Sequence, residues 1–446
     1  MIESRIETYT YENQDIQRVQ IVELDSFDSL CFLKPKYNPL SFTRLCELYR
    51  NYIMPKYSLV FGHIVLFRIP EDLYVPFPEE DEEYGVVYSK YARTVIAFNR
   101  HVKYINKEIV IDDDTTRNFY NELKKNGCLE IVHGKQKNIS FLPIGNNFGF
   151  LSESSSESQV LANSSFFVMD RFDCDSIYDC VSTPIGLCLK NGIIKNPPLF
   201  NREALLVDIE NNVSIRKMDI SDINVHIDGI TYIDKENCRF FSRPKHKKTP
   251  KGGYDIIVVG DQVISVKEGG NATIPSSGFA IHVKDKPEIY SSYVSYDGLE
   301  EYRFGIQVGN SVIVDGQETN SFVSKFYNYL LPWTTSYPPT FYPLNFKKAR
   351  APRIVLGTTK ENKPVLLWFE GAPKFGYIPH KDSCGASLSE VVDICKSLEL
   401  HNAIHLDGGG SAQIIYNGRR RLMVSDRNPG DFSETERAIA MGLYVK

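Results

Sequence analysis

The stretch Ala403-Ile404-His405-Leu406-Asp407-Gly408-Gly409-Gly410-Ser411 decides how the rest of the sequence is interpreted. Its first four residues have the length and apolar character of a short buried strand, so Asp407 is expected where the strand ends and the chain turns. Glycines adopt backbone angles that other residues avoid, and they let a ligand approach the main chain. Successive amides can then converge on an anion beside the carboxylate. The pattern predicts a binding loop, whereas a lone Asp-Gly pair would indicate only a turn.

The residues before this loop predict a helix. Ser387 and Glu390 form a Ser-x-x-Glu capping box, and apolar residues recur at helical spacing up to Leu398. We expect a helix of about fourteen residues that packs against the sheet. His401-Asn402 is expected to close it, because Asn tolerates the left-handed conformation that ends helices.

The residues after the loop predict a hairpin. Residues 412–416 and 419–424 have strand character, and Asn417-Gly418 between them is typical of a type I′ turn. A second acidic and basic group, Glu434-Thr435-Glu436-Arg437, precedes a final strand at 438–445. The predicted order is therefore helix, strand, glycine loop, hairpin and last strand.

Together these motifs resemble those of the phosphodiester glycosidase family. The resemblance rests on Leu406–Ser411 with the helix before it, and on Glu436-Arg437 before the last strand. It extends over about residues 130–446, with a long interruption in the middle. Three further segments fit in the same order: Asn163-Ser164-Ser165-Phe166-Phe167, then Pro184-Ile185-Gly186 with Lys190-Asn191-Gly192, then Pro352-Arg353 with Gly357, Glu370 and Gly371.

The chain departs from the family pattern at three places. Ser164 and Ser165 stand where the family has glycines, so side chains occupy positions that are usually bare. Glu370 stands where an aspartate is common, and Ile354-Val355 replace small polar residues after Pro352-Arg353. These differences bear on sugar specificity and activity rather than on the fold.

The resemblance implies hydrolysis of a sugar linked through its anomeric carbon to a phosphodiester, with release of the sugar and a phosphomonoester. Glycoside cleavage develops positive charge at the anomeric carbon, and a neighbouring carboxylate stabilises or captures that centre. Asp407 is the first candidate for this role. Glu370 and Glu436 are the candidates for general acid or base, and the sequence does not separate their roles.

A phosphate leaving group needs its negative charge held more than it needs a proton. Guanidinium groups and the amides of a glycine loop supply such contacts. The predicted ligands of the substrate and its phosphate are Asn163, Arg353, Gly408, Gly409, Gly410, Ser411 and Arg437. No metal site or cofactor is predicted, because no Cys-x-x-Cys pair occurs. The acidic stretch 170–179 could bind a cation through oxygen ligands, but it lacks the regular spacing of a calcium loop, so a solvated loop is preferred.

Other interpretations stay open. Arg353 is also consistent with a surface ion pair, Glu436-Arg437 with a solvated pair, and Asn163 with a turn before a buried strand. For the function, one alternative is a protein that binds a sugar phosphate or nucleotide without cleaving it. The other is a phosphodiesterase that breaks the P–O bond, which normally requires a metal cage.

We expect an α+β fold with a mixed β-sheet core and flanking helices, arranged in two domains. Residues 1–125 are predicted to form a small α+β domain of unknown role, with helices at 40–53 and 115–126. Residues 126–446 form the phosphodiester glycosidase-like domain, whose middle part, about 215–345, is rich in short strands. In it, Trp333 or Tyr342 is a candidate wall of a sugar site.

Composition limits the function classes. The chain has 446 residues and a net charge of −5, which gives no general attraction to nucleic acid. No apolar run is long enough to span a bilayer, and the first residues lack the pattern of a secretory signal. The nine cysteines, an odd number, argue against complete disulfide pairing. We therefore expect a cytoplasmic enzyme with a small-molecule or glycan sugar-phosphodiester substrate and an oligomeric state that the sequence leaves open.

Overall fold

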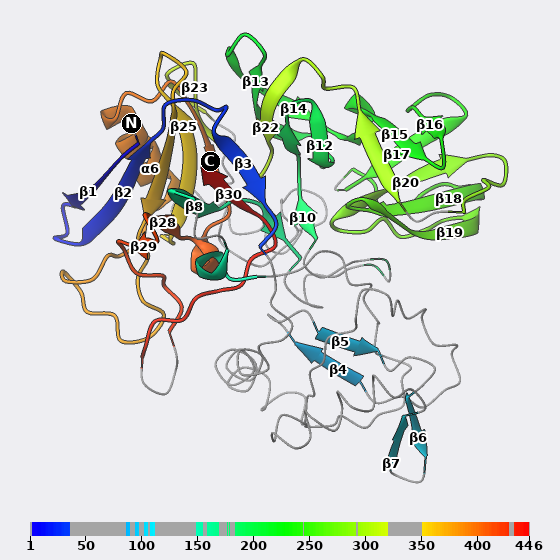
Figure 1. The fold of residues 1–446 in the computed structure, drawn as a ribbon, viewed down its shortest axis with the longest axis horizontal. Coiled ribbons are helices and arrows are strands. Elements are labelled where there is room, and N and C mark those ends of the chain that lie inside the picture. Colours follow the sequence, from blue (N-terminus) through cyan, green and yellow to red (C-terminus); the bar gives the residue numbers. More distant parts are fainter. Residues whose placement is uncertain are drawn as a thin grey trace.

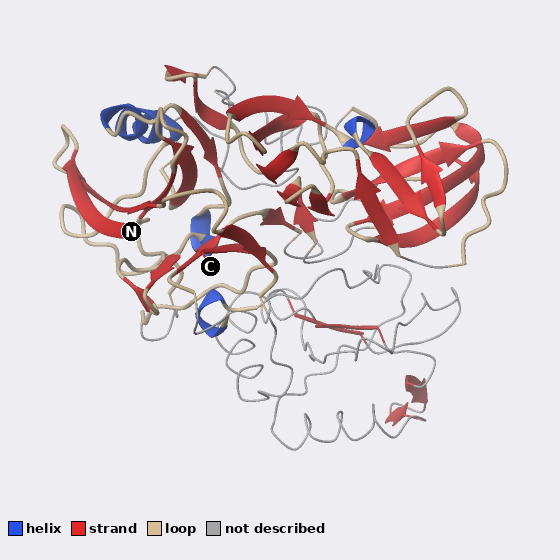
Figure 2. Cartoon of the chain, turned by 45° about the horizontal axis from the view of Figure 1, so that its top comes forward, coloured by secondary structure: helices blue, strands red, loops and turns tan. Residues whose placement is uncertain are grey.

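The computed structural model describes residues 2–35, 149–154, 158–168, 176, 178, 183–243, 245–290, 293–319, 350–427 and 432–445. In these residues strands dominate and helices are few (Figures 1 and 2). The backbone of two further hairpins is also described. They consist of β4 (Val86–Ser89) with β5 (Thr94–Ala97), and β6 (Val102–Ile105) with β7 (Glu108–Ile111).

The largest sheet has seven strands, and each runs antiparallel to its neighbours. Its central strands are almost continuous apolar runs whose residues are all buried, which is the pattern of a sheet covered on both faces. In sheet order the strands are β1 (Glu3–Thr10), β2 (Ile16–Glu23), β26 (Pro364–Phe369), β25 (Arg353–Thr358), β27 (Asn402–His405), β23 (Ser311–Val314) and β24 (Gln317–Glu318).

One face of this large sheet is covered by the helix α6 (Leu388–Ser397). The predicted capping box is confirmed: the Ser387 hydroxyl accepts from the Glu390 amide at 3.2 Å, and the Glu390 carboxylate accepts from the Ser387 amide at 2.8 Å. The apolar stripe of the helix then packs on alternate residues of β25 and β26. The buried residues of this interface include Leu388, Val391, Val392, Cys395, Val355, Leu367 and Phe369.

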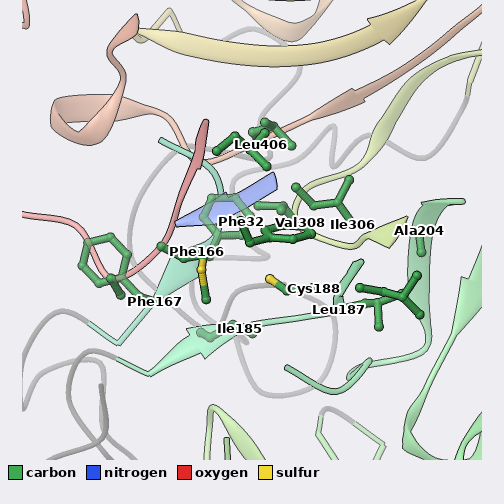
Figure 3. Close-up of a cluster of buried hydrophobic side chains, with 14 of the residues drawn as sticks. Phe32, Phe166, Phe167, Ile185, Leu187, Cys188, Ala204, Ile306, Val308 and Leu406 are labelled. Carbon is green, nitrogen blue, oxygen red and sulfur yellow. The ribbon is translucent and has the colours of Figure 1, made fainter. Parts of the chain in front are cut away.

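The other face of the large sheet shares one core with two five-stranded sheets. Figure 3 shows buried side chains of this core, among them Phe32, Phe166, Cys188 and Leu406. The second sheet is β29 (Arg419–Arg420), β28 (Ile414–Tyr416), β8 (Val160–Asn163), β30 (Gly442–Val445) and β3 (Leu30–Leu33), and the third is β12 (Ile193–Asn196), β11 (Cys188–Lys190), β22 (Tyr302–Ile306), β13 (Arg202–Asp208) and β14 (Val213–Met218).

The remaining described elements are short sheets and single turns of 3₁₀ helix. The strands between residues 224 and 297 lie together, on the right of Figure 1. They form a three-stranded sheet, β16 (Ile230–Tyr232), β15 (Asn224–Ile227) and β21 (Val294–Asp297), and a four-stranded sheet, β17 (Cys238–Ser242), β20 (Gly278–Val283), β18 (Lys251–Val259) and β19 (Gln262–Gly270). Elsewhere β9 (Phe166–Phe167) pairs with β10 (Pro184–Ile185), and the 3₁₀ turns are η3 (Leu151–Glu153), η5 (Ile220–Asp222) and η7 (Gly409–Ser411).

The first residues of the chain complete sheets that belong to its last third. Val19 of β2 lies opposite Phe369 of β26, and Leu30 of β3 lies opposite Val445 of β30. Strands from the segment predicted as a separate N-terminal domain are thus part of both sheets around the glycine loop. The boundary at residue 125 stays a prediction, because most of residues 36–148 lie outside the described ranges.

The predicted α+β fold with a mixed sheet and flanking helices is wrong. Within the described residues α6 is the only α-helix, and all registered strand pairs are antiparallel. The connections explain this result. Turns with positive φ, such as Asn191-Gly192, Asp228-Gly229 and Asn417-Gly418, join consecutive strands directly and leave no room for the crossover helices that parallel strands need. The helices predicted at 40–53 and 115–126 lie outside the described residues.

Several local predictions are confirmed. The predicted strand before Asp407 is β27, and Asn417 and Gly418 have φ of 49° and 73°, as a type I′ turn requires. The last strand is shorter than predicted, because β30 begins at Gly442. No helix in the described residues has the length and apolarity needed to cross a membrane.

Candidate active site

The glycine loop leaves the large sheet at the end of β27 and is held by the second sheet. The Asp407 amide donates to the Ser164 carbonyl at 2.8 Å, and the Asn163 side-chain amide donates to the Asp407 carbonyl at 2.7 Å. The Asn163 side-chain oxygen accepts from the Gln413 amide at 2.9 Å. Asn163 therefore connects both ends of the loop to β8. It is a buried strand residue and not the turn residue that was considered as an alternative.

Asp407 is buried at the start of this loop, and the whole residue is only 6% exposed. Burial raises its pKa to about 7, although a hydrogen bond from Ser411, the positive charge of Arg437 and the Gly408 amide act in the opposite direction. A carboxyl group with this pKa exchanges its proton near neutrality. That property is typical of groups in catalytic sites, although buried ion networks also produce it.

Arg437 lies directly on the glycine loop. A β-carbon on Gly410 would stand 2.2 Å from the Arg437 Nη2 atom, so only glycine admits the guanidinium here. The same guanidinium donates from Nε and Nη2 to the Asp426 carboxylate at 3.0 and 2.8 Å. The predicted cation is thus beside Asp407, and it shares its charge with a second buried acid.

Asp426 and Lys374 belong to the site and were not predicted from the sequence. The Asp426 side chain is nearly buried, and the Lys374 ammonium lies 3.9 Å from its second carboxylate oxygen. The Lys374 amide also donates to the Ser425 carbonyl at 2.9 Å, which brings the segment after β26 beside Asp426. Neither residue lies in a recognisable motif. The sequence around Asp426 signals a turn, and only the fold places it against Arg437.

Glu370 is buried and accepts three hydrogen bonds. Its carboxylate receives the Arg18 guanidinium at 3.0 Å, the Ser383 hydroxyl at 2.7 Å and the Met423 amide at 2.9 Å. These donors come from β2 and from two loops, so the carboxylate joins three separate segments. These contacts indicate that the Glu370 carboxylate holds the three segments in position around the site.

Glu436 is also buried, with a different set of donors from its neighbour Arg437. It accepts from the Ser152 amide at 3.0 Å and from the Arg420 guanidinium at 2.9 Å. The interpretation of Glu436-Arg437 as a solvated pair is therefore wrong, since both side chains are largely enclosed and they have different partners.

Arg353 is completely buried, which excludes the surface ion pair considered for it. Its Nε donates at 3.0 Å to the Ala386 carbonyl, immediately before the N-cap of α6. Burial lowers the pKa of His405 well below its ordinary value, and the charges of Arg353 and Arg202 lower it further. Arg353 thus lies near His405, between the large sheet and the start of α6.

The two serines that replace family glycines are accommodated inside the protein. Both are buried, and the Ser165 hydroxyl contacts the Cys188 thiol at 3.4 Å. The Ser164 hydroxyl has no hydrogen-bond partner among the described residues, although its own carbonyl holds the Asp407 amide. The aromatic segment with Trp333 and Tyr342, and most of the acidic stretch 170–179, lie outside the described residues.

The protein is rich in β-strands and has a glycine loop that carries a buried acid, Asp407, with the guanidinium of Arg437 packed against it. Residues 232–446 match the family model described as phosphodiester glycosidase, which confirms the resemblance seen in the sequence. The matched range includes Asp407, Arg437, Glu370, Glu436 and Arg353. Asn163 lies outside it.

The solved structures described here share little sequence identity with this chain. No curated protein matches the sequence. Among solved structures, a hypothetical protein from Synechocystis has 12% identity and a TM-score of 0.44, and the chain spans only 62% of its length. The catalytic domain of zebrafish N-acetylglucosamine-1-phosphodiester alpha-N-acetylglucosaminidase has 12% identity and a TM-score of 0.42, with 82% of its length covered. An exported protein of Burkholderia pseudomallei has 10% identity and a TM-score of 0.38, with 96% covered. All three alignments cover 100% of this chain.

Proposed function

We propose that the protein is a glycosidase that cleaves the bond between the anomeric carbon of a sugar and a phosphodiester. The observation that carries this proposal is the Asp407 carboxyl group, enclosed at a strand end with Arg437 packed on the adjoining glycines. The Asp407 carboxylate can face the positive charge that develops at the anomeric carbon, while Arg437 holds the phosphate. The family match of residues 232–446 supports the same reaction class.

In this mechanism the Asp407 carboxylate stabilises or captures the anomeric centre. The oxygen of a water molecule forms the new bond to the anomeric carbon, and the bond from that carbon to the phosphate oxygen breaks. The electron pair leaves with the phosphate. One proton of the water stays on the new sugar hydroxyl, and the other is transferred to the phosphate, which becomes a phosphomonoester. Arg437 and the amides of Gly408, Gly409 and Gly410 hold the charge that this group gains.

Glu370 and Glu436 stay candidates for the proton transfer from water, but their contacts favour a positioning role. Both already accept hydrogen bonds from arginines. The contacts of Arg353 likewise favour support of the loop through β25 and α6. We therefore assign the chemistry to Asp407 and the phosphate to Arg437, with the other predicted residues as their support.

One observation favours the second candidate, a protein that binds a sugar phosphate without cleaving it. Ser164 and Ser165 occupy positions where the family has glycines, directly beside the Asp407 backbone. This departure from the family pattern next to Asp407 is the reason to consider binding without cleavage.

Incubation with a panel of sugar-1-phosphodiesters in oxygen-18 water separates the candidates. We expect the label in the released sugar. Label in the phosphate would instead indicate P–O cleavage, and tight binding without turnover would indicate the binding protein. The Asp407→Asn variant serves as the matched control, because it keeps the shape of the side chain and removes the charge.

A further inference from the structure

Two exposed phenylalanines lie beside the site and contact each other. Phe375 is 39% exposed and Phe432 is 56% exposed, and their ring centroids are 6.4 Å apart with the planes tilted by 47°. A β-carbon on Gly376 would meet the Phe432 ring at 3.9 Å, so this ring also lies over the neighbouring backbone. Single exposed apolar residues are common on protein surfaces, but a pair in contact is a small apolar surface. We call this pair the aromatic rim.

The backbone at Phe432 is unfavourable for its side chain. Its φ is +59°, a conformation that glycine and asparagine adopt readily and bulky residues rarely do. The residue therefore combines a strained backbone with an apolar ring exposed to water, and neither contributes to stability. Such positions concentrate at functional sites, where the strain is retained because the side chain is needed in that place.

The aromatic rim is connected to the candidate active site by a short series of contacts. The Lys374 amide donates to the Ser425 carbonyl, and the Thr435 amide donates to the Asp426 carbonyl at 3.0 Å. Phe375 follows Lys374 and Phe432 precedes Thr435 by three positions, so both rings lie on segments that hold Asp426. Asp426 in turn binds Arg437, which lies on the glycine loop.

These contacts give an order from the interior to the surface. Asp407 and Asp426 are both buried, and Arg437 lies between them on the glycine loop. Lys374, whose side chain is 48% exposed, follows next to Asp426, and the aromatic rim begins at the residue after Lys374. A sugar phosphodiester has the matching order of anomeric carbon, phosphate and aglycone. An aglycone that extends outward from a phosphate at Arg437 would meet Lys374 and then the two rings.

We propose that the aromatic rim is the subsite for the aglycone, and that it selects phosphodiesters whose aglycone is apolar, either aryl or alkyl. The inference rests on the proposed function, because the placement of the phosphate comes from it. Aromatic rings bind planar groups by stacking and alkyl groups by burial of apolar surface. The shared requirement is an apolar group attached directly to the phosphate.

The test measures binding of benzyl phosphate, octyl phosphate and methyl phosphate to the full chain by calorimetry. We expect the benzyl or the octyl ester, or both, to bind about tenfold more tightly than the methyl ester. A preference for benzyl alone assigns the subsite to aryl aglycones, and a preference for octyl alone assigns it to alkyl aglycones. Equal binding of the three esters would overturn the proposal.

The variants Phe375→Ser and Phe432→Asn should remove this preference and leave methyl phosphate binding unchanged. Asparagine is chosen at 432 because it tolerates positive φ, so the ring is removed without a change of backbone. Tyr290→Ala, at a residue that is 85% exposed on the connection between β20 and β21, is the matched control. Retention of the preference in both phenylalanine variants would also overturn the proposal.

The binding experiment and the oxygen-18 experiment can refute the aromatic rim and the hydrolysis independently of each other. A lost preference in the two variants, together with no turnover in the oxygen-18 experiment, would support the aromatic rim and refute hydrolysis. Turnover without any preference among the esters would support hydrolysis and refute the aromatic rim. Circular dichroism melting curves establish that each variant is folded.

Discussion

Two of the buried aspartates, Asp255 and Asp407, are held in different ways, and the contrast shows which is suited to chemistry. Asp255, in the middle of β18, has one oxygen 2.7 Å from His282 Nδ1, and its other oxygen accepts from Thr249 and from the Ala272 amide. Asp407 follows the end of β27, where it has Ser411, one loop amide and the charge of a guanidinium that is shared with Asp426.

The difference follows from the position in the sheet. Asp255 and His282 are opposite each other in the strand register, so the pairing of β18 with β20 supplies the partner of the carboxylate. Asp407 lies beyond the last paired residue, and its loop contains glycines that offer no side chains. Asp255 has partners supplied by the sheet and helps to hold its strands together. Asp407 has few hydrogen-bond donors, so burial keeps the pKa of its carboxyl group raised, which suits it to proton transfer or catalysis.

The largest expected effect concerns turnover. Asp407→Asn should lower kcat/KM by about three orders of magnitude or more, because the amide cannot face the charge of an oxocarbenium-like transition state. Asp255→Asn should change kcat/KM little when it is expressed per folded molecule. Both are measured with the substrate that the oxygen-18 panel identifies, and a fully active Asp407→Asn variant would remove this residue from the mechanism.

The next effect is on the pH dependence of stability. With a pKa near 3.8 when unfolded and about 7 when folded, the Asp407 carboxyl group holds a proton between these values only in the folded protein. Its contribution to stability is therefore present at low pH and is lost as the pH rises through 7. Asp407→Asn does not titrate, so it should exceed the native protein in stability at pH 8 by on the order of 4 kcal/mol.

Urea unfolding of both proteins between pH 5 and pH 8 measures this difference. The gap should narrow as the pH falls. A gap that is constant over this range would show that folding does not raise the pKa of the Asp407 carboxyl group.

A third effect distinguishes the two aspartates by stability alone. Asp255→Ala leaves His282, Thr249 and the Ala272 amide without their acceptor, which should reduce the free energy of unfolding by about 3 kcal/mol. Thermal or urea unfolding measures it, with Lys267→Ala as a control on the neighbouring strand. A loss below about 0.5 kcal/mol, the range of ordinary surface substitutions, would mean that this cluster does not stabilise the sheet.

The smallest effect separates two adjacent glycines. Gly410→Ala places a methyl group where Arg437 lies, so the guanidinium must move and kcat/KM should fall about tenfold, the equivalent of about 1.4 kcal/mol. Gly409 has φ of 63° with nothing within 4 Å of its β-carbon position. Gly409→Ala should therefore cost about 1 kcal/mol of stability through backbone strain and leave kcat/KM nearly unchanged. Equal kinetic losses in the two variants would argue against a specific contact with Arg437.

Local signals in the sequence predicted the parts of the site that local chemistry determines. The capping box at Ser387, the turn at Asn417-Gly418 and the strand before Asp407 each depend on a few neighbouring residues, and all were confirmed. The burial of Arg353 and the pairing of Arg437 with Asp426 depend on residues that come together only in the fold. No short window of sequence contains that information.

The fold class was missed for a related reason. Helical periodicity was strong at 388–397, and helices were expected to flank the sheet throughout, but most connections are tight turns between antiparallel strands. Register between distant strands, such as β2 with β26, is set by which buried faces match across more than 300 residues. The cytoplasmic location expected from the sequence stays a prediction.

The pairing of β2 with β26 and of β3 with β30 has a consequence for biosynthesis. β2 and β3 leave the ribosome more than 300 residues before β26 and β30, so their edges stay unpaired until that later part of the chain has been synthesised. Contacts of such sequence separation form slowly, and open strand edges invite association with other chains. The nascent chain should therefore depend on chaperones until β26 and β30 have emerged.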